Sequence, residues 1–154
     1  MKRILIQFSF FVALLALSVS CIEDIDQTRI FKGDPLVEFN SPVSNANFTR
    51  LTNAGAGVIS EQVNLIAPQF SSDQTITFRV DSELTTAEAG VHYNLGSNGS
   101  FVIPANSSFG SAQVEILGTA IPAGTTRLLV LELVGNDVIK PSENHKRVRI
   151  SIRP

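Results

Sequence analysis

Residues 75–82 read Thr-Ile-Thr-Phe-Arg-Val-Asp-Ser, a run in which polar and apolar side chains alternate. Ile76, Phe78 and Val80 share one face, which is typical of a strand whose other face meets water. Similar short segments, separated by Gly, Pro, Asn and Ser, recur along the chain. The predicted strands are residues 36–39, 58–66, 75–82, 91–95, 100–103, 111–117, 126–134 and 146–152. These eight strands predict an all-β fold, an antiparallel β-sandwich.

The strand at residues 126–134 is apolar on both faces, which predicts a central place in its sheet. Leu129, Leu131 and Leu133 would fill the core. Leu128 and Val130 then face outward, either beneath a flanking segment, which is the favoured reading, or as part of a surface for a partner.

Asn98-Gly99 stands between two apolar stretches and predicts a type I′ hairpin that pairs the strands at residues 91–95 and 100–103. If successive strands reverse direction, the connections 82–90, 104–110 and 135–145 all lie at one end of the sandwich. Residues 40–57 form the only long segment without periodicity, and a loop is predicted there.

Length and charge restrict the function. The chain has 154 residues, and residues 34–154 are expected to form one domain. Loss of the first 20 residues removes Lys2 and Arg3, so that 12 basic and 14 acidic residues become 10 and 14, a net charge of -4. Nucleic-acid binding needs a basic surface, so it is not expected.

The first 21 residues have the pattern of an export signal. Lys2-Arg3 precede an apolar run from Ile4 to Leu17, and Ser18, Val19 and Ser20 come before Cys21, the only cysteine. The run is too short for a transmembrane helix, which needs about 20 apolar residues. Leu-Ser-Val-Ser-Cys resembles the bacterial lipoprotein signal, in the variant form known from Bacteroidota. That resemblance implies a lipid on Cys21, and the alternative is an ordinary secretory signal.

Residues 21–33 are expected to be a flexible tether. Glu23, Asp24 and Asp26 resemble the acidic surface-export signal of Bacteroidota lipoproteins, which implies an outer-membrane protein facing the cell exterior. The alternative is that these three residues are simply solvated charges.

Three segments resemble the Calx-beta repeat, namely residues 86–93 (Thr-Ala-Glu-Ala-Gly-Val-His-Tyr), 101–107 (Phe-Val-Ile-Pro-Ala-Asn-Ser) and 112–116 (Ala-Gln-Val-Glu-Ile). The family has an Ala-x-x-Gly-x-Asp-Tyr turn, a Phe/Ile-Pro-Ala-Gly step and a Val-x-Ile strand in this order. The resemblance implies an immunoglobulin-like sandwich, as in Calx-beta-like domains of Bacteroidota surface lipoproteins of unknown function.

Some Calx-beta domains bind calcium through loop carboxylates. The candidate ligands here, expected near one end, are Asp81, Glu83, Glu88, Asp137 and Glu143. The family's Asp is His92 in this chain, which removes one hard ligand. The competing interpretation is that all five are solvated loop carboxylates.

Two further features are candidates for ligand contact. Phe48 could stack on a sugar or a protein, although a plug over the core is the favoured reading. Arg147, Arg149 and Arg153 alternate along residues 146–152 and beyond, where they could meet an anionic polysaccharide or lipid phosphate, or keep an edge strand from pairing.

No catalytic residues are proposed, and an enzyme is not expected. His92 and His145 are the only histidines, they lack a metal-binding spacing, and His92 is predicted to point outward. The sequence favours a lipid-anchored surface module for binding or structure, an accessory to glycan capture or adhesion, with polysaccharide or surface proteins as partners. The alternatives are a calcium-stabilised adhesion module and, less favoured, a small hydrolase.

Overall fold

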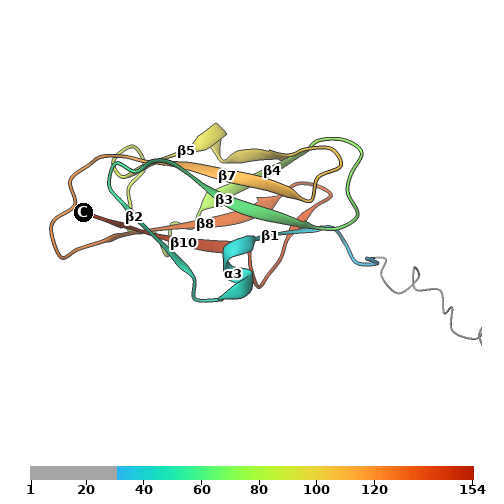
Figure 1. Cartoon of the computed structure of the whole chain (residues 1–154), viewed down its shortest axis with the longest axis horizontal. Coiled ribbons are helices and arrows are strands. Elements are labelled where there is room, and N and C mark those ends of the chain that lie inside the picture. Colours follow the sequence, from blue (N-terminus) through green and yellow to red (C-terminus); the bar gives the residue numbers. More distant parts are fainter. Residues whose placement is uncertain (1–30) are drawn as a thin grey trace, which may run out of the picture. The chain divides into compact units, whose positions relative to one another are not determined.

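Residues 31–154, which this computed structural model describes, form ten strands and one short α-helix (Figure 1). The compact unit is Gly33–Pro154. Its elements are β1 (Leu36–Phe39), α3 (Asn40–Ser44), β2 (Thr49–Asn53), β3 (Gly57–Ile66), β4 (Gln74–Val80), β5 (Tyr93–Leu95), the 3-10 turn η1 (Gly96–Asn98), β6 (Ser100–Ile103), β7 (Phe109–Ile116), β8 (Arg127–Gly135), β9 (Lys140–Pro141) and β10 (Arg147–Arg153).

The strands make two five-stranded sheets that enclose one apolar core. Sheet A has the order β5-β7-β3-β1-β9, and sheet B has the order β2-β10-β8-β4-β6. Alternate residues of each strand point inward, such as Val63 and Leu65 on β3 or Val148 and Ile150 on β10. The sandwich is therefore as predicted, except that two pairs, β1 with β9 and β2 with β10, are parallel.

All eight predicted strands are present, with ends within two residues of the prediction. The prediction of a loop at residues 40–57 was wrong, because this segment contains α3 and β2. In β2 the inward-facing position between the sheets is occupied by Arg50, which pairs with the buried Glu61. A charged residue at an inward position removes the apolar alternation by which a strand is recognised.

The predicted Asn98-Gly99 hairpin was also wrong. Both residues have positive φ, 53° and 78°, but Ser97 does too, at 45°. β5 pairs with β7 in sheet A, whereas β6 pairs with β4 in sheet B. The Gly99 carbonyl accepts a hydrogen bond from the Phe78 N–H (2.8 Å), which starts β6 beside β4. The chain thus crosses between the sheets instead of reversing within one.

This crossing changes which connections lie together. β5 and β3 run in the same direction, because both are antiparallel to β7, and β6 is antiparallel to β4. Since β3 and β4 run in opposite directions (Figure 1), β5 and β6 run in the same direction. Connection 82–90 consequently lies at the end that holds the C-terminus, whereas connections 104–110 and 135–145 lie at the end where the chain enters (Figure 1). The prediction of one shared end was wrong, since it assumed a reversal at Asn98-Gly99.

β8 has its predicted central place, between β10 and β4. Leu129, Leu131 and Leu133 are in the core. Val130 faces outward yet is fully buried, because residues 81–85 run along β8. The Val130 N–H donates to the Thr85 hydroxyl (3.0 Å), and the Val130 carbonyl accepts from the Asp81 N–H (3.0 Å). The favoured reading of this outer position is confirmed.

Candidate functional site

The outer face of sheet A is polar and almost uncharged, and we call it the amide face. Among the outward-facing residues of β5, β7, β3 and β1 there is no Lys or Arg, and the acids are Glu38 and Glu115. The residues that define the face are Asn94, Phe109, Ser111, Gln113, Glu115, Val58, Ser60, Gln62, Asn64 and Glu38, with the half-buried Leu36 and Ile66. At the edge of the sheet, Lys140 of β9 lies opposite Leu36 and faces the same side.

An exposed aromatic ring lies beside a chain of amides on this face. Phe109 on β7 is directly opposite Asn64 on β3, and 56% of its surface is exposed. The Gln62 side-chain N–H donates to the Asn64 Oδ1 (2.9 Å), and the Asn64 Nδ2 donates to the Asn40 Oδ1 (3.1 Å). Glu38 on β1 is the next residue across from Asn64. A flat ring and pre-oriented amides therefore lie next to one another.

The amide chain keeps capacity for further hydrogen bonds. Each carboxamide has two N–H donors and an oxygen with two lone pairs, and the internal bonds of Gln62 and Asn40 use only part of these. Both residues are exposed. The site can offer donors and acceptors together, which is what a hydroxyl group requires.

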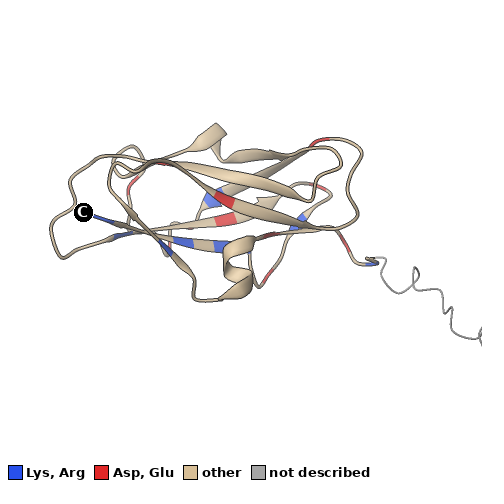
Figure 2. Cartoon of the chain, viewed as in Figure 1, with Lys and Arg blue, Asp and Glu red and all other residues tan. Residues whose placement is uncertain are grey.

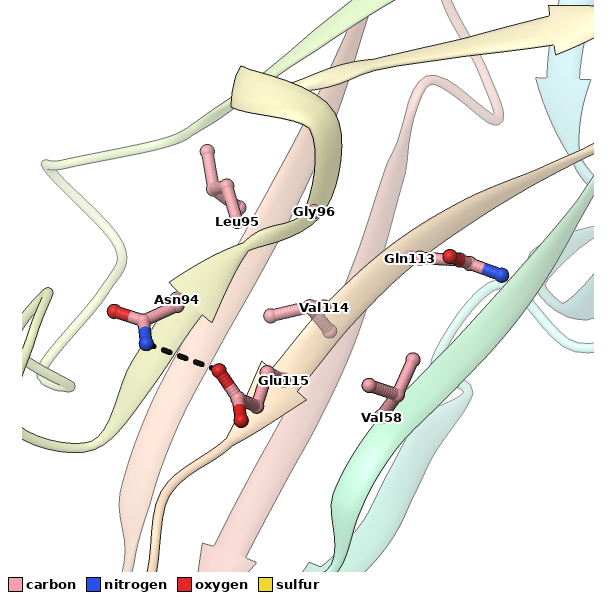
Figure 3. A pocket seen from close by; sticks show the side chains of 7 residues that line it. All are labelled: Val58, Asn94, Leu95, Gly96, Gln113, Val114 and Glu115. Carbon is pink, nitrogen blue, oxygen red and sulfur yellow. Dashed lines mark hydrogen bonds between the residues drawn. The ribbon is translucent and has the colours of Figure 1, made fainter.

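At the other end of the amide face is a shallow hollow of about 260 Å³ (Figure 3). Val58 and Gln113 lie on one side of it, and Asn94 and Glu115 on the other, joined by a hydrogen bond of 3.0 Å. Val58 is 64% exposed. This part of the face adds an apolar spot and polar groups to the surface on which Phe109 lies.

The outer face of sheet B is different, because it is charged. A hollow of about 320 Å³ is lined by Arg79, Asp81, Ser82, Glu83, Glu132 and Arg147. Two N–H groups of Arg79 bind one oxygen of Glu132 (2.9 and 2.7 Å). Arg147 lies between the two acids, 2.8 Å from Asp81 Oδ2 and 3.0 Å from Glu132 Oε1. Figure 2 shows the basic residues that follow one another along β10.

One of the candidate calcium ligands, Asp81, is held by these ion pairs. Asp81 is buried, and its second oxygen accepts the backbone N–H groups of Glu83 and Leu84. In residues 31–154 there is no group of three or more His, Cys, Asp or Glu side chains arranged to hold a metal ion. The calcium alternative stays a prediction from the sequence, without a preformed cluster to support it.

The predicted ligand residues are distributed over the unit. Asp81 and Glu83 lie in the charged hollow, and Glu143 is linked to it through Lys146, 2.7 Å from Glu143 and 3.9 Å from Glu132. Hydrogen bonding to Lys146 lowers the pKa of Glu143. Glu88 and Asp137 are exposed at opposite ends of the sandwich.

The other candidates lie as follows. Phe48 is partly buried and packs against the core, the arrangement favoured for it from the sequence. Arg149 and Arg153 are exposed on the outer face of sheet B. Their strand is not an edge strand, since β10 lies between β2 and β8, so the edge-protection reading was wrong. Cys21 is outside the described residues.

The two histidines make different contacts. His92 was predicted to point outward, but it is buried, and its Nδ1 accepts the Glu88 N–H (3.0 Å), which fixes the turn before β5. His145 Nδ1 lies 3.3 Å from Glu38 Oε2. Within residues 31–154, no serine hydroxyl hydrogen-bonds to either ring, so a Ser-His pair is not formed there.

The sequence contained a signal for Phe109 that was missed. The strand was predicted to begin at Ser111, whereas β7 begins at Phe109. Extending the alternation by two residues places Phe109 on the same face as Ser111, Gln113 and Glu115, all exposed. The pairing of Asn64 with Phe109 and the contact with Asn40 depend on strand order, which the sequence did not supply.

Comparison with known proteins supports the fold. The architecture is that of the immunoglobulin-like Calx-beta sandwiches. The apo form of the Calx CBD1 domain superposes with a TM-score of 0.58 at 12% sequence identity, covering 79% of this chain and 97% of that one. CBD12 from CALX1.2 superposes with a TM-score of 0.55 at 12% identity, covering 77% of this chain and 44% of that one.

The sequence comparisons gave no matches. No protein-family model matches the chain, and no curated protein matches it. The Calx-beta resemblance read from the sequence is therefore supported by the structural comparison alone, at the level of the fold.

Proposed function

We propose that this chain is a lipid-anchored, non-catalytic module of the cell surface that binds neutral glycan through the amide face of sheet A. The observation that carries the proposal is the exposed Phe109 ring directly beside the hydrogen-bonded amides of Gln62, Asn64 and Asn40.

The chemistry of this patch suits a sugar. A pyranose ring presents apolar C–H groups on its faces, which pack on an aromatic ring, and hydroxyl groups at its edge, which both donate and accept hydrogen bonds. Amides can donate to a hydroxyl oxygen and accept from a hydroxyl hydrogen, and the absence of basic residues on β3 and β7, which carry the patch, favours an uncharged ligand. Since the amide chain is preformed by internal hydrogen bonds, less conformational entropy is lost on binding.

The location rests on the sequence. No helix in residues 31–154 is long and apolar enough to cross a membrane, and attachment is proposed to come from a lipid on Cys21. Residues 21–32 could extend at most about 40 Å. The sandwich would then remain close to the membrane, with a sheet face available to extracellular polysaccharide.

The test is binding of the soluble chain of residues 22–154 to a panel of neutral polysaccharides, by affinity electrophoresis and calorimetry. We expect at least one neutral polysaccharide to bind, and Phe109→Ala to weaken it at least about tenfold, because aromatic residues at the centre of an interface contribute most. Gln62→Ala should weaken it less.

Val102→Ala is the matched control, because Val102 is also exposed (46%) but lies on β6 in sheet B. It should leave binding unchanged. If no neutral polysaccharide binds, or if Phe109→Ala and Val102→Ala bind equally well, the proposal is wrong. Thermal unfolding of each variant confirms that the fold is retained.

A further inference from the structure

Charge is divided unequally between the two faces of the sandwich. Residues 33–154 contain 8 basic and 11 acidic residues, a net charge of -3. Four of the six arginines in this unit nevertheless point outward from sheet B: Arg79 on β4 and Arg147, Arg149 and Arg153 on β10. On the outer face of sheet A the acids Glu38 and Glu115 outnumber the one basic residue, Lys140, so the sheet B face is the more positive side of an acidic domain.

Two of these arginines, Arg149 and Arg153, have no acid beside them in residues 31–154. The other two, Arg79 and Arg147, are neutralised by Glu132 and Asp81. Arg149 lies between Thr49 and Val130, and Arg153 lies opposite Asn53. For neither does the described part of the chain provide a salt bridge. Arg149 and Arg153 are exposed, and within residues 31–154 they leave two uncompensated positive charges on one face of sheet B.

The surface between them is open and partly apolar. Ser151 separates the two arginines along β10, and Leu51, 59% exposed, lies opposite Ser151 on β2. Neither arginine lines the charged hollow or the hollow of the amide face. An open patch with two cations and an exposed leucine matches an extended anionic surface better than it matches a single ligand held in a pocket.

We propose that the sheet B face, through Arg149 and Arg153, lies against the phosphate-bearing lipid surface to which the chain is anchored, which leaves the amide face directed outward. This inference rests on the proposed anchor and glycan site. Because the two sheets are back to back, contact through one face exposes the other. A short tether alone would not select this orientation.

The experiment uses residues 22–154, which lack the cysteine and contain the whole core. Cosedimentation is measured with vesicles of phosphatidylcholine alone and of phosphatidylcholine with phosphatidylglycerol. The chain should bind only the anionic vesicles. Binding should weaken from 10 mM to 150 mM salt, because the Debye length shortens from about 30 Å to about 8 Å. Each basic residue near such a surface contributes about 1 kcal/mol, which is about fivefold in the partition coefficient. Arg149→Gln with Arg153→Gln should therefore lower the partition coefficient about 30-fold.

A matched control changes the net charge equally on the opposite face. Ser60→Glu with Ser111→Glu also shifts the charge by two units, on exposed positions of sheet A. It should keep nearly all vesicle binding. Equal loss in the two double variants would mean that net charge alone matters, which overturns the proposal. Absence of binding to anionic vesicles at low salt also overturns it.

Soluble dextran sulfate and the glycan assay separate the remaining outcomes. Binding to dextran sulfate without binding to anionic vesicles would assign the arginines to a polyanion in solution and overturn the membrane assignment. Phe109→Ala should retain vesicle binding, and the arginine double variant should retain binding of neutral polysaccharide. The vesicle assay therefore tests the membrane contact and the polysaccharide assay tests the glycan site, so one proposal can fail while the other stands.

Discussion

At the scale of single residues, the most unusual side chain is the carboxylate of Glu61. It is 1% exposed and points between the sheets from β3, where it pairs with Arg50 of β2 and accepts a hydrogen bond from the Ser41 hydroxyl (3.3 Å). A buried charge is tolerated only when it is paired and hydrogen-bonded. The pair also joins the edge of sheet B to the middle of sheet A beneath α3.

Arg50→Ala should therefore lower the free energy of unfolding by about 3 kcal/mol, the low end for removing one partner of a buried pair, because Arg50 is itself partly exposed. The measurement is the urea midpoint at constant slope. Arg50→Met with Glu61→Leu removes both charges and should recover most of the loss. If the single and the double variant were equally unstable, packing and not charge would be the cause.

Tyr93 provides a direct test of burial at one residue. It is the only tyrosine, and the chain has no tryptophan, so tyrosinate absorbance reports on Tyr93 alone. Burial raises the pKa of Tyr93 above its ordinary value of 10.0. The folded chain should titrate above pH 10 in ultraviolet absorbance, and the urea-unfolded chain near pH 10.

The sign of the stability effect follows from this shift. An acid whose pKa is raised by folding contributes stability that is complete below the unfolded pKa and is lost as pH rises through the folded pKa. Unfolding free energy should fall above pH 10 in the native chain, and Tyr93→Phe should remove that part of the fall. A titration at the same pH in the folded and unfolded chains would contradict the burial.

At the scale of elements, the crossing between β5 and β6 depends on Gly99. Its φ is 78°, and a β-carbon there would lie 2.5 Å from the Phe78 carbonyl oxygen. Gly124 has almost the same φ, 77°, but a β-carbon would meet nothing within 4 Å. The two glycines have the same backbone conformation but differ in the room available for a β-carbon.

Gly124→Ala should cost about 1 kcal/mol for the left-handed conformation alone. Gly99→Ala should cost about 2 kcal/mol more, because the added carbon displaces backbone that starts the β4–β6 pairing. Chemical denaturation of both variants measures the difference. Equal losses of unfolding free energy in the two variants would show that the close approach of Gly99 to β4 adds nothing to the cost of the substitution.

This crossing also shows what the sequence could supply. Strand positions and inward faces follow from the alternation of side chains, as in 75–82, because burial enforces it. Strand partners do not: Asn98-Gly99 has the backbone of a hairpin turn, yet the residue before it, Ser97, adds a third positive φ and redirects the chain. One wrong reversal was enough to place connection 82–90 at the wrong end, with connections 104–110 and 135–145.

The site was less predictable than the fold. The sequence offered Phe48 as the aromatic contact, and the structure puts Phe48 against the core and leaves Phe109 exposed. Gln62 and Asn64 are neighbours on one face of β3, and the start of α3 brings Asn40 to Asn64. The contact with Asn40 depends on the pairing of β1 with β3, and the position of Phe109 on the pairing of β3 with β7, which no local pattern in residues 40–64 could have revealed.

At the scale of the whole molecule, the proposed lipid anchor and the arginines of sheet B imply two kinds of membrane association that respond differently to salt. A lipid on Cys21 would hold the chain by burying methylene groups, at about 0.8 kcal/mol each, and salt does not screen that term. Contact through Arg149 and Arg153 is electrostatic and weakens as the Debye length shortens. Fractionation with a salt wash can therefore tell them apart.

Cys21→Ser in the full chain should release the protein from the membrane fraction after a high-salt wash and remove the added acyl mass. Asp26→Ala, in the same tether, should leave both unchanged. The arginine double variant should stay with the membrane, because the lipid anchor alone is enough for attachment. The arginines are expected to set only the orientation of the sandwich. A Cys21→Ser chain that stays membrane-bound in high salt would refute the lipid anchor, and the proposed location would fall with it.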